Sequence, residues 1–205
     1  MSPTLNELVT AGLLPSSFAI DFFAAAIYIG SALSCFVTGW YADRYGRRGA
    51  LMASAVPLFC GWVLITGQWG CTSLLIGRLL NGFGSAVVFT TFGIYVAETV
   101  AASRRGCWTV LGEASISVGT LVAFSLGQWL DARWLAAVAA VAAVAVFMAV
   151  SRVPETPRYY MEHNRIEDAR RSLDWIRGAP AETEFAALQA QLDDHPSHKV
   201  TTGKS

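Results

Sequence analysis

The stretch GWYADRYGRRG, residues 39–49, decides how the chain is interpreted, because it contains four charges and three glycines between two long apolar segments. The apolar segments are residues 21–41 and 49–68. Each has the ~20 residues that a helix needs to cross the hydrocarbon core of a bilayer. A compact charged group between two such segments is typical of a short aqueous turn between membrane-spanning helices.

The composition favours a membrane protein over a soluble domain. Of the 205 residues, 54% are hydrophobic and 15% are charged, whereas soluble domains carry about 25% charged residues. The net charge of zero gives no argument for a nucleic-acid partner. The cysteines show no CxxC spacing and have no nearby histidine, so we expect no zinc site, no disulfide framework and no cofactor. They are Cys35, Cys60, Cys71 and Cys107.

Five segments are apolar enough to span a bilayer, so we expect an all-α membrane bundle. The predicted spans are 21–41, 49–68, 73–97, 107–130 and 133–152. Gly30 and Ser34 at small-xxx-small spacing, and the glycine-rich third span, predict close packing between helices. Asp21 is predicted to cap the first span. A soluble helical core is the alternative, and five successive runs of this length disfavour it.

The arginines predict which ends of the spans face the cytoplasm, because basic residues accumulate on that side. They lie after the first, third and fifth spans, and are Arg44, Arg47, Arg48, Arg104, Arg105, Arg152 and Arg158. The intervening turns, 69–72 and 131–132, carry no lysine or arginine. The sequence therefore predicts an extracellular segment over 1–20 and a cytoplasmic C-terminal tail. An odd number of spans with an outside N-terminus and no signal peptide also suggests that a helix precedes residue 1.

Beyond the bundle 21–152, the sequence predicts a cytoplasmic helical linker over 153–194 and a disordered tail over 195–205. In the linker, Asn164 is predicted as a helix N-cap, with Glu167 three residues later as in a capping box. Gly178 is the predicted end of that helix. A second linker helix is expected near 181–193.

Two further stretches carry motifs. One is GRLLNGFGSAVVFTTFGIYVAETVAASRRG, residues 77–106, and the other is PETPRYYMEHNRIEDARRSLDWIRG, residues 154–178. Together with 39–49 they make the chain resemble the N-terminal half of a sugar porter of the major facilitator superfamily, the group that contains facilitative glucose transporters and insect trehalose transporters. The matching motif residues are Gly39, Asp43, Arg44, Gly46, Arg47, Arg48, Gly77, Arg78, Gly82, Tyr95, Glu98, Arg105, Gly106, Pro154, Glu155, Pro157 and Arg158.

The resemblance implies a partial major facilitator fold, in which the five spans are helices two to six of twelve. Helix one and the second half would then lie outside this fragment. The resemblance also implies a cytoplasmic gate, a network of ion pairs that holds the two halves together while the transporter is open outward. Its members would be Asp43, Arg44, Arg47, Arg48, Glu98, Arg105, Glu155 and Arg158. The alternative is that the arginines only fix the topology.

Three residues are candidates for contact with substrate. Glu113 lies eight positions past Arg105, roughly 12 Å into the membrane at 1.5 Å per residue, and an ionisable group at that depth indicates a functional site. The family typically has a sugar-binding glutamine there, so a carboxylate could bind sugar hydroxyls or couple transport to a proton. The alternative is a protonated glutamate bonded within its own helix, with no role in transport. Gly119 matches a glycine that lines the pathway, and Arg78 would line the outer vestibule or reach the interface.

The predicted function is transmembrane transport of a hexose or disaccharide by alternating access. We expect no enzymatic activity, because the sequence lacks nucleophile, metal and phosphate-binding motifs. The expected partners are the sugar, the lipid bilayer and the C-terminal half of the transporter, and the expected location is the plasma membrane. The alternatives are an organic-ion transporter of the same superfamily and a truncated membrane protein that binds other proteins without transporting.

Overall fold

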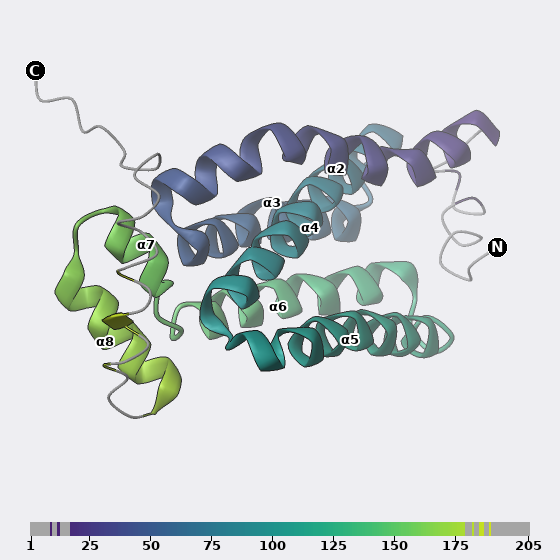
Figure 1. Ribbon diagram of the computed structural model, residues 1–205. Helices are drawn as coiled ribbons and strands as arrows, with labels where there is room; N and C mark the ends of the chain where they lie inside the picture. Colours follow the sequence, from purple (N-terminus) through teal and green to yellow (C-terminus); the bar gives the residue numbers. More distant parts are fainter. Residues whose placement is uncertain are drawn as a thin grey trace, which may run out of the picture.

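The computed structural model describes residues 17–178 and, outside this range, residues 9, 12, 182, 185, 186 and 189. Within 17–178 every regular element is a helix (Figure 1). The long helices are α2 (Ser17–Tyr45), α3 (Arg47–Gly67), α4 (Cys71–Thr99), α5 (Arg105–Leu126) and α6 (Ala132–Val150). The short ones are the 3-10 turn η1 (Ala102–Arg104), α7 (Pro157–Glu162) and α8 (Ile166–Arg177).

The five long helices confirm the predicted all-α membrane bundle. Each is long and apolar enough to cross a bilayer, with a mean hydropathy between 1.5 and 2.1. The largest difference from the predicted spans is at α2, which begins at Ser17 and ends at Tyr45. Asp21 therefore lies inside α2 as an exposed residue, and its prediction as a cap is wrong. The apolar residues just before Asp21 extend the helix past it.

α4 packs against both α2 and α3, and α3 packs in turn against α6 (Figure 1). On the α2 side, Gly30 lies against the carbonyl group of Leu79, and Gly82 lies against that of Ile27. A Cβ at either glycine would collide with these main-chain atoms. The Ser31 hydroxyl donates a shared hydrogen bond to the carbonyl oxygens of Ile27 (2.9 Å) and Gly82 (3.1 Å). Close packing through small residues is thus confirmed at this interface.

The α3–α4 interface uses glycines in the same way. A Cβ on Gly61 would lie 2.7 Å from the Gly77 carbonyl oxygen, and one on Gly77 would lie 2.8 Å from the Gly61 carbonyl oxygen. Asn81 lies against Gly61, is 2% exposed, and has no hydrogen-bond partner for its side chain among the described residues. Gly93, in the same predicted span, has no atom within 4 Å of an added Cβ. Close packing therefore does not extend to Gly93.

α5 differs from the other long helices, because none of its 22 residues is buried among the described residues. It contacts chiefly α4 and η1, with Gly112 lying against the ring of Phe92. Every residue of α5 is exposed except Gly112 and Leu126, which are partly buried. Whatever surrounds this helix in the membrane, its candidate residue Glu113 lies on an open surface in the part of the chain that the structure describes.

α7 and α8 form a small unit at one end of the bundle (Figure 1). Its core contains Met161, Ala169, Leu173 and Phe185. Gly178 ends α8 in the left-handed conformation, with φ of 70°, as predicted.

Asn164 is not the N-cap of α8: Arg165 occupies that position, without a side-chain cap bond. Asn164 instead takes the left-handed conformation in the preceding turn, with φ of 56°, which asparagine tolerates better than most residues. The predicted helix 181–193 lies largely outside the described residues, and the predicted tail 195–205 lies wholly outside them.

Candidate functional site

The turn between α2 and α3 consists of Gly46, which has φ of 87° and is buried. This conformation is in the region that favours glycine. A Cβ at Gly46 would also collide with the Glu155 carboxylate. Two independent constraints, one on the backbone and one on space, therefore require a glycine between the two helices.

Glu155 places its carboxylate at the N-terminus of α3. Both carboxylate oxygens accept from the Arg48 backbone N–H at 3.0 Å, and Oε1 also accepts from the Thr156 N–H at 3.0 Å. Gly46 has no side chain to cap α3, so Glu155, 107 positions after Arg48 in sequence, satisfies the free Arg48 N–H group instead. A carboxylate at this end also interacts favourably with the helix dipole. Glu155 is 6% exposed.

Arg47 connects the same turn to the end of α4. Its Nε and Nη2 donate to one oxygen of Glu98, at 3.2 and 2.9 Å, and Nη1 donates to the Ala42 carbonyl at 3.3 Å. The Arg47 and Glu98 side chains are 8% and 9% exposed. Removing one partner of such a buried pair costs about 3–5 kcal/mol, because the remaining charge stays buried and unpaired.

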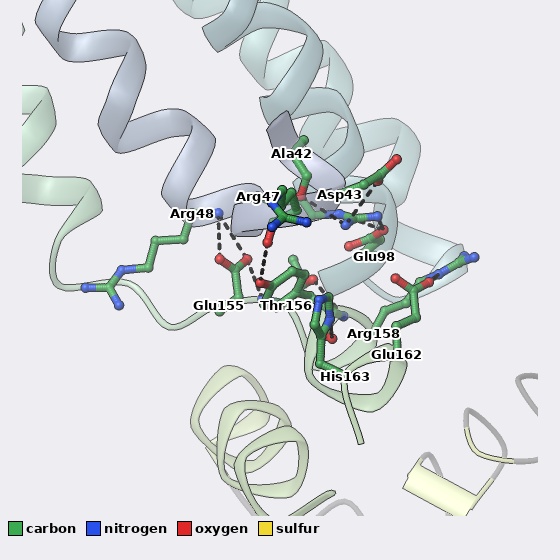
Figure 2. Close-up of polar contacts among 12 residues, drawn as sticks. Ala42, Asp43, Arg47, Arg48, Glu98, Glu155, Thr156, Arg158, Glu162 and His163 are labelled. Atoms are coloured by element: carbon green, nitrogen blue, oxygen red, sulfur yellow. Dashed lines mark hydrogen bonds and ion pairs between the residues drawn. The ribbon is translucent and has the colours of Figure 1, made fainter. Parts of the chain in front are cut away.

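The Arg47–Glu98 pair leaves one carboxylate oxygen without a partner among the described residues. The second carboxylate oxygen of Glu98, Oε2, is sealed from solvent and has no hydrogen-bond partner among the described residues. Asp43 approaches Arg47 Nη1 at 3.4 Å but its side chain is 74% exposed. Solvent screening makes this second contact weak. Arg47 and Glu98 therefore form the principal ion pair of the cluster, with Asp43 at its edge (Figure 2).

Arg48 contributes its backbone rather than its charge to Glu155. Figure 2 shows its side chain extending away from the Glu155 carboxylate. Its Nη2 donates to the Ser151 carbonyl at 2.6 Å, just past the end of α6. A cation at a helix C-terminus is favourable. Arg48 thus links α3 to the end of α6.

Three hydrogen bonds attach the 153–178 segment to the bundle through main-chain carbonyl groups, and a fourth joins two residues within the segment. The Tyr95 hydroxyl donates to Pro154 at 3.0 Å, and the Tyr159 hydroxyl donates to Arg44 at 3.1 Å. Arg177 Nη1 donates to Thr99 at 3.1 Å, and the Ser172 hydroxyl donates to the Glu155 carbonyl. Tyr159, Ser172 and Arg177 were not predicted, because a bond to a carbonyl group imposes no residue type on the acceptor. For Tyr159, its place in the third motif was the available signal.

Three of the predicted gate residues make no hydrogen bond or ion pair with the cluster of Asp43, Arg47, Arg48, Glu98 and Glu155. Arg105 donates through Nε to the Val100 carbonyl at 3.0 Å, beside its own helix. Arg158 pairs with Glu162 one turn along α7, at 3.0 Å, and this hydrogen bond raises the pKa of the guanidinium. Arg44 is exposed and contributes its carbonyl group to Tyr159.

The candidate substrate residues lie away from the charged cluster. Glu113 and Gly119 are both exposed on α5, and an added Cβ at Gly119 meets nothing within 4 Å. Arg78 is partly buried on α4, with its guanidinium carbon 4.5 Å from the centroid of the Phe23 ring. Phe23 was not predicted, since an aromatic residue in a predicted span is usually interpreted as facing lipid or the core.

The remaining motif glycines fall into two classes. Gly77 and Gly82 lie at helix crossings, whereas Gly39 and Gly106 have nothing within 4 Å of an added Cβ. Among the described residues, no three His, Cys, Asp or Glu side chains gather in a way that could hold a metal ion. Among the described residues, the cluster of Asp43, Arg47, Arg48, Glu98 and Glu155 contains the nearly buried Arg47–Glu98 ion pair and the buried Glu155 carboxylate, whereas the ion pairs on α7 and α8 are more exposed.

The chain is similar to known sugar transporters. A family model described as sugar (and other) transporter matches residues 4–203. The facilitated trehalose transporter Tret1 of Bombyx mori is 35% identical over 142 residues, which are 69% of this chain and 28% of that protein. Tret1 of Drosophila virilis is 34% identical over 146 residues, 71% of this chain and 16% of that protein. The chain thus spans less than a third of the length of these curated relatives.

Solved structures show the same fold. The xylose transporter XylE from E. coli, in a partially occluded inward-open conformation, superposes with a TM-score of 0.84 at 22% identity, covering 96% of this chain and 55% of that chain. XylE bound to 6-bromo-6-deoxy-D-glucose gives a TM-score of 0.83 over 94% of this chain and 48% of that one. These relatives are transporters, in agreement with the prediction of a non-enzymatic protein. The chain is a multi-pass membrane protein and belongs to the sugar (and other) transporter family.

Proposed function

We propose that the chain forms the N-terminal bundle of a sugar porter that moves a hexose or disaccharide by alternating access. The observation that carries the proposal is that three sequence motifs far apart in the chain meet at one end of the bundle. Arg47 from the first motif pairs with Glu98 from the second, and Glu155 from the third caps the helix that begins at Arg47. If the motifs served only to cap α3 through Glu155, the buried Arg47–Glu98 ion pair would not be needed.

In this proposal the charged cluster is a cytoplasmic gate. Asp43 is exposed at the edge of the Arg47–Glu98 pair, and the Glu98 Oε2 atom has no partner among the described residues. The Asp43 carboxylate and the Glu98 Oε2 atom are therefore two acceptors for donors on a second bundle. In this proposal the second bundle approaches in one transport state and leaves in the other. Alternating access requires contacts that differ between the states, because only such contacts shift the equilibrium between them.

We assign the proposed substrate contacts to Glu113, Gly119 and Arg78. Glu113 and Gly119 are six positions apart on α5, the helix without buried residues in the described chain. Transporter sites of this superfamily lie near the bilayer midplane between two repeats. The exposed surface of α5, which carries the Glu113 carboxylate, supports a place for this helix beside such a site. A carboxylate there accepts hydrogen bonds from sugar hydroxyls or takes up a proton that couples to transport.

The proposed orientation follows from the arginines. The charged cluster and the α7–α8 unit lie on the cytoplasmic side, with segment 1–20 outside, 21–152 as the bundle, 153–194 as the cytoplasmic linker and 195–205 as its tail. Trp69 and Trp129, 73% and 87% exposed, would then belong to the outer aromatic belt. We propose the plasma membrane as the location, with the bilayer and the C-terminal half of a transporter as partners.

A chimera tests the proposal. Residues 17–178 replace the corresponding segment of the Bombyx mori trehalose transporter, and uptake of labelled trehalose, glucose and xylose is measured in cells that lack endogenous uptake. Saturable uptake of at least one sugar is expected. A matched chimera with Glu98→Gln should reach the membrane but transport more slowly.

The same assay separates the alternatives. Inhibition of the chimera by organic cations rather than by sugars would favour an organic-ion transporter. A chimera that is folded and inserted but takes up none of these solutes would overturn the proposal. Co-expression of the 205-residue chain with the intact trehalose transporter then tests for an inhibitory interaction, which a non-transporting binding protein predicts.

A further inference from the structure

A buried contact between α2 and α4 lies at the end of the bundle opposite the charged cluster. The Arg78 guanidinium carbon lies 4.5 Å from the centroid of the Phe23 ring, and Phe23 is 3% exposed. At this distance the ring face attracts a cation. The attraction is stronger away from water than on an open surface.

Phe23 is itself held firmly. It belongs to a core cluster with Ile65, Leu74, Ala132 and Ala136, so residues from α2, α3, α4 and α6 surround it. Close packing of this kind restricts the ring to one position. The ring therefore offers Arg78 a fixed surface rather than an adaptable one.

The Arg78 Nε atom is sealed from solvent and has no hydrogen-bond partner among the described residues. The guanidinium group is planar and rigid, so holding it against the ring restricts the directions that its terminal nitrogens can take. A flexible side chain is thereby converted into an oriented donor.

We propose that Phe23 is a positioning residue for Arg78. Its ring holds the guanidinium group at the α2–α4 interface by a cation–π contact and so directs the terminal N–H groups toward a hydroxyl-bearing ligand entering from the outer side. The ligand in this statement rests on the proposed sugar transport. The ring contact and its effect on the guanidinium group do not depend on that function.

The test uses the 205-residue chain in lipid nanodiscs. Phenylalanine at position 23 is replaced by its 4-fluoro, 3,5-difluoro and 3,4,5-trifluoro analogues, which remove electron density from the ring face with little change of shape. The readout is the rate at which p-hydroxyphenylglyoxal modifies Arg78, followed by mass spectrometry. We expect the rate to rise stepwise along the series, several-fold in total, because a weaker ring contact leaves the guanidinium group freer to react.

The control is the same trifluoro analogue at Phe22, which neighbours Phe23 but is 42% exposed. Its labelling rate at Arg78 should equal that of the unmodified chain. Phe23→Leu also removes core volume and can disturb folding, so the fluorinated series carries the conclusion. A flat rate along the series at position 23 would overturn the proposal, since a purely structural role for the ring predicts no dependence on its electron density.

A second measurement separates the two proposals. In the trehalose transporter chimera, trifluorophenylalanine at position 23 should raise the KM for sugar several-fold and leave kcat nearly unchanged. A chimera that transports no sugar contradicts the proposed function but not a graded labelling result. Graded labelling with an unchanged KM would show that the contact exists without serving the substrate, which overturns the positioning role.

Discussion

Arg47 directs two of its nitrogens to a single oxygen of Glu98, at 3.2 and 2.9 Å, and leaves the other oxygen of that carboxylate without a partner among the described residues. This is an asymmetric ion pair in a nearly dry site, with side-chain exposures of 8% and 9%. It connects the first turn of α3 to the last turn of α4. Its stability therefore depends strongly on both charges being present.

Breaking this pair should destabilise the chain substantially. Glu98→Gln should lower the free energy of unfolding by about 3 kcal/mol, because it leaves Arg47 buried without a counter-charge. The double variant Arg47→Met with Glu98→Met should recover most of the loss. Thermal unfolding in detergent micelles measures both. The control is Arg158→Gln, whose pair with Glu162 is 47% exposed on the arginine side and should change stability by less than about 1 kcal/mol.

A methyl group at Gly46 should have a similarly clear effect. Gly46→Ala forces a strained backbone with φ of 87° and a collision with the Glu155 carboxylate, so we expect a loss of about 2 kcal/mol in unfolding free energy. Gly39→Ala is the matched control, since nothing lies within 4 Å of its new Cβ. Because alanine is the better helix former, that variant should gain up to about 1 kcal/mol. Equal effects would contradict the assigned turn geometry.

The α2–α4 crossing offers a similar comparison. Gly82→Ala should push the two helices apart and cost about 1–3 kcal/mol, because the methyl group meets the main chain of Ile27. Gly93→Ala, on the same helix with open space around it, should be neutral or stabilising. A disulfide cross-linking rate between cysteines placed on α2 and α4 reports the separation directly. Slower cross-linking is expected for Gly82→Ala alone.

Alkaline pH should weaken the attachment of α7. Burial and the Glu155 carboxylate raise the pKa of Tyr159 above its ordinary value of 10.0. The neutral phenol donates to the Arg44 carbonyl, so its contribution to stability is complete below pH 10 and disappears as pH rises through the folded-state pKa. Absorbance at 295 nm, compared with Tyr159→Phe, should show a tyrosine that titrates late. The stability difference between the two proteins should shrink over that same range, and a constant difference would contradict the assigned bond.

Glu113 gives a prediction for transport. In the trehalose transporter chimera, Glu113→Ala should raise the KM for sugar roughly 10-fold, the equivalent of losing a hydrogen bond to a charged group. Glu113→Gln should retain most of the affinity, because the amide oxygen still accepts hydrogen bonds. The control is Ser115→Ala, whose hydroxyl group donates to the Leu111 carbonyl within α5. A KM unchanged in Glu113→Ala would remove this residue from the proposed substrate contacts.

The sequence predicts the helices of this fold better than it predicts which side chains contact one another. Apolar runs of about 20 residues define the five spans, and motif spacing brings Arg47, Glu98 and Glu155 into one expected cluster. The roles within that cluster differ from expectation. Arg48 uses its backbone N–H to bind Glu155, and Arg105 and Arg158 bind groups nearby in sequence. A motif records which residues are present, whereas side-chain direction depends on helix rotation and on the turn at Gly46.

Contacts with main-chain carbonyl groups were the hardest to predict. Tyr159 and Arg177 bind the carbonyl groups of Arg44 and Thr99, and those acceptors could be any residue. The Phe23–Arg78 contact was missed for a related reason, because a ring and a guanidinium group 55 positions apart meet only after α2 and α4 have packed. The sequence indicates which helices are closely packed, through glycines and serines, but not which side chains meet beyond the crossing point.

Within the part of the chain that the structure describes, α5 has no buried residue, and this has a consequence for how the chain is made. α2, α3 and α4 contact one another directly, so they can associate as soon as they leave the ribosome and enter the bilayer, and α6 can then join them through α3. α5 emerges before α6 but has little surface on the other described helices to join, and its mean hydropathy of 1.5 is, with that of α4, the lowest of the five spans. Among the described helices, insertion of α5 therefore depends more on its own sequence than on packing, and polar substitutions on this helix should reduce the yield of correctly inserted protein before they affect the packing of the other four.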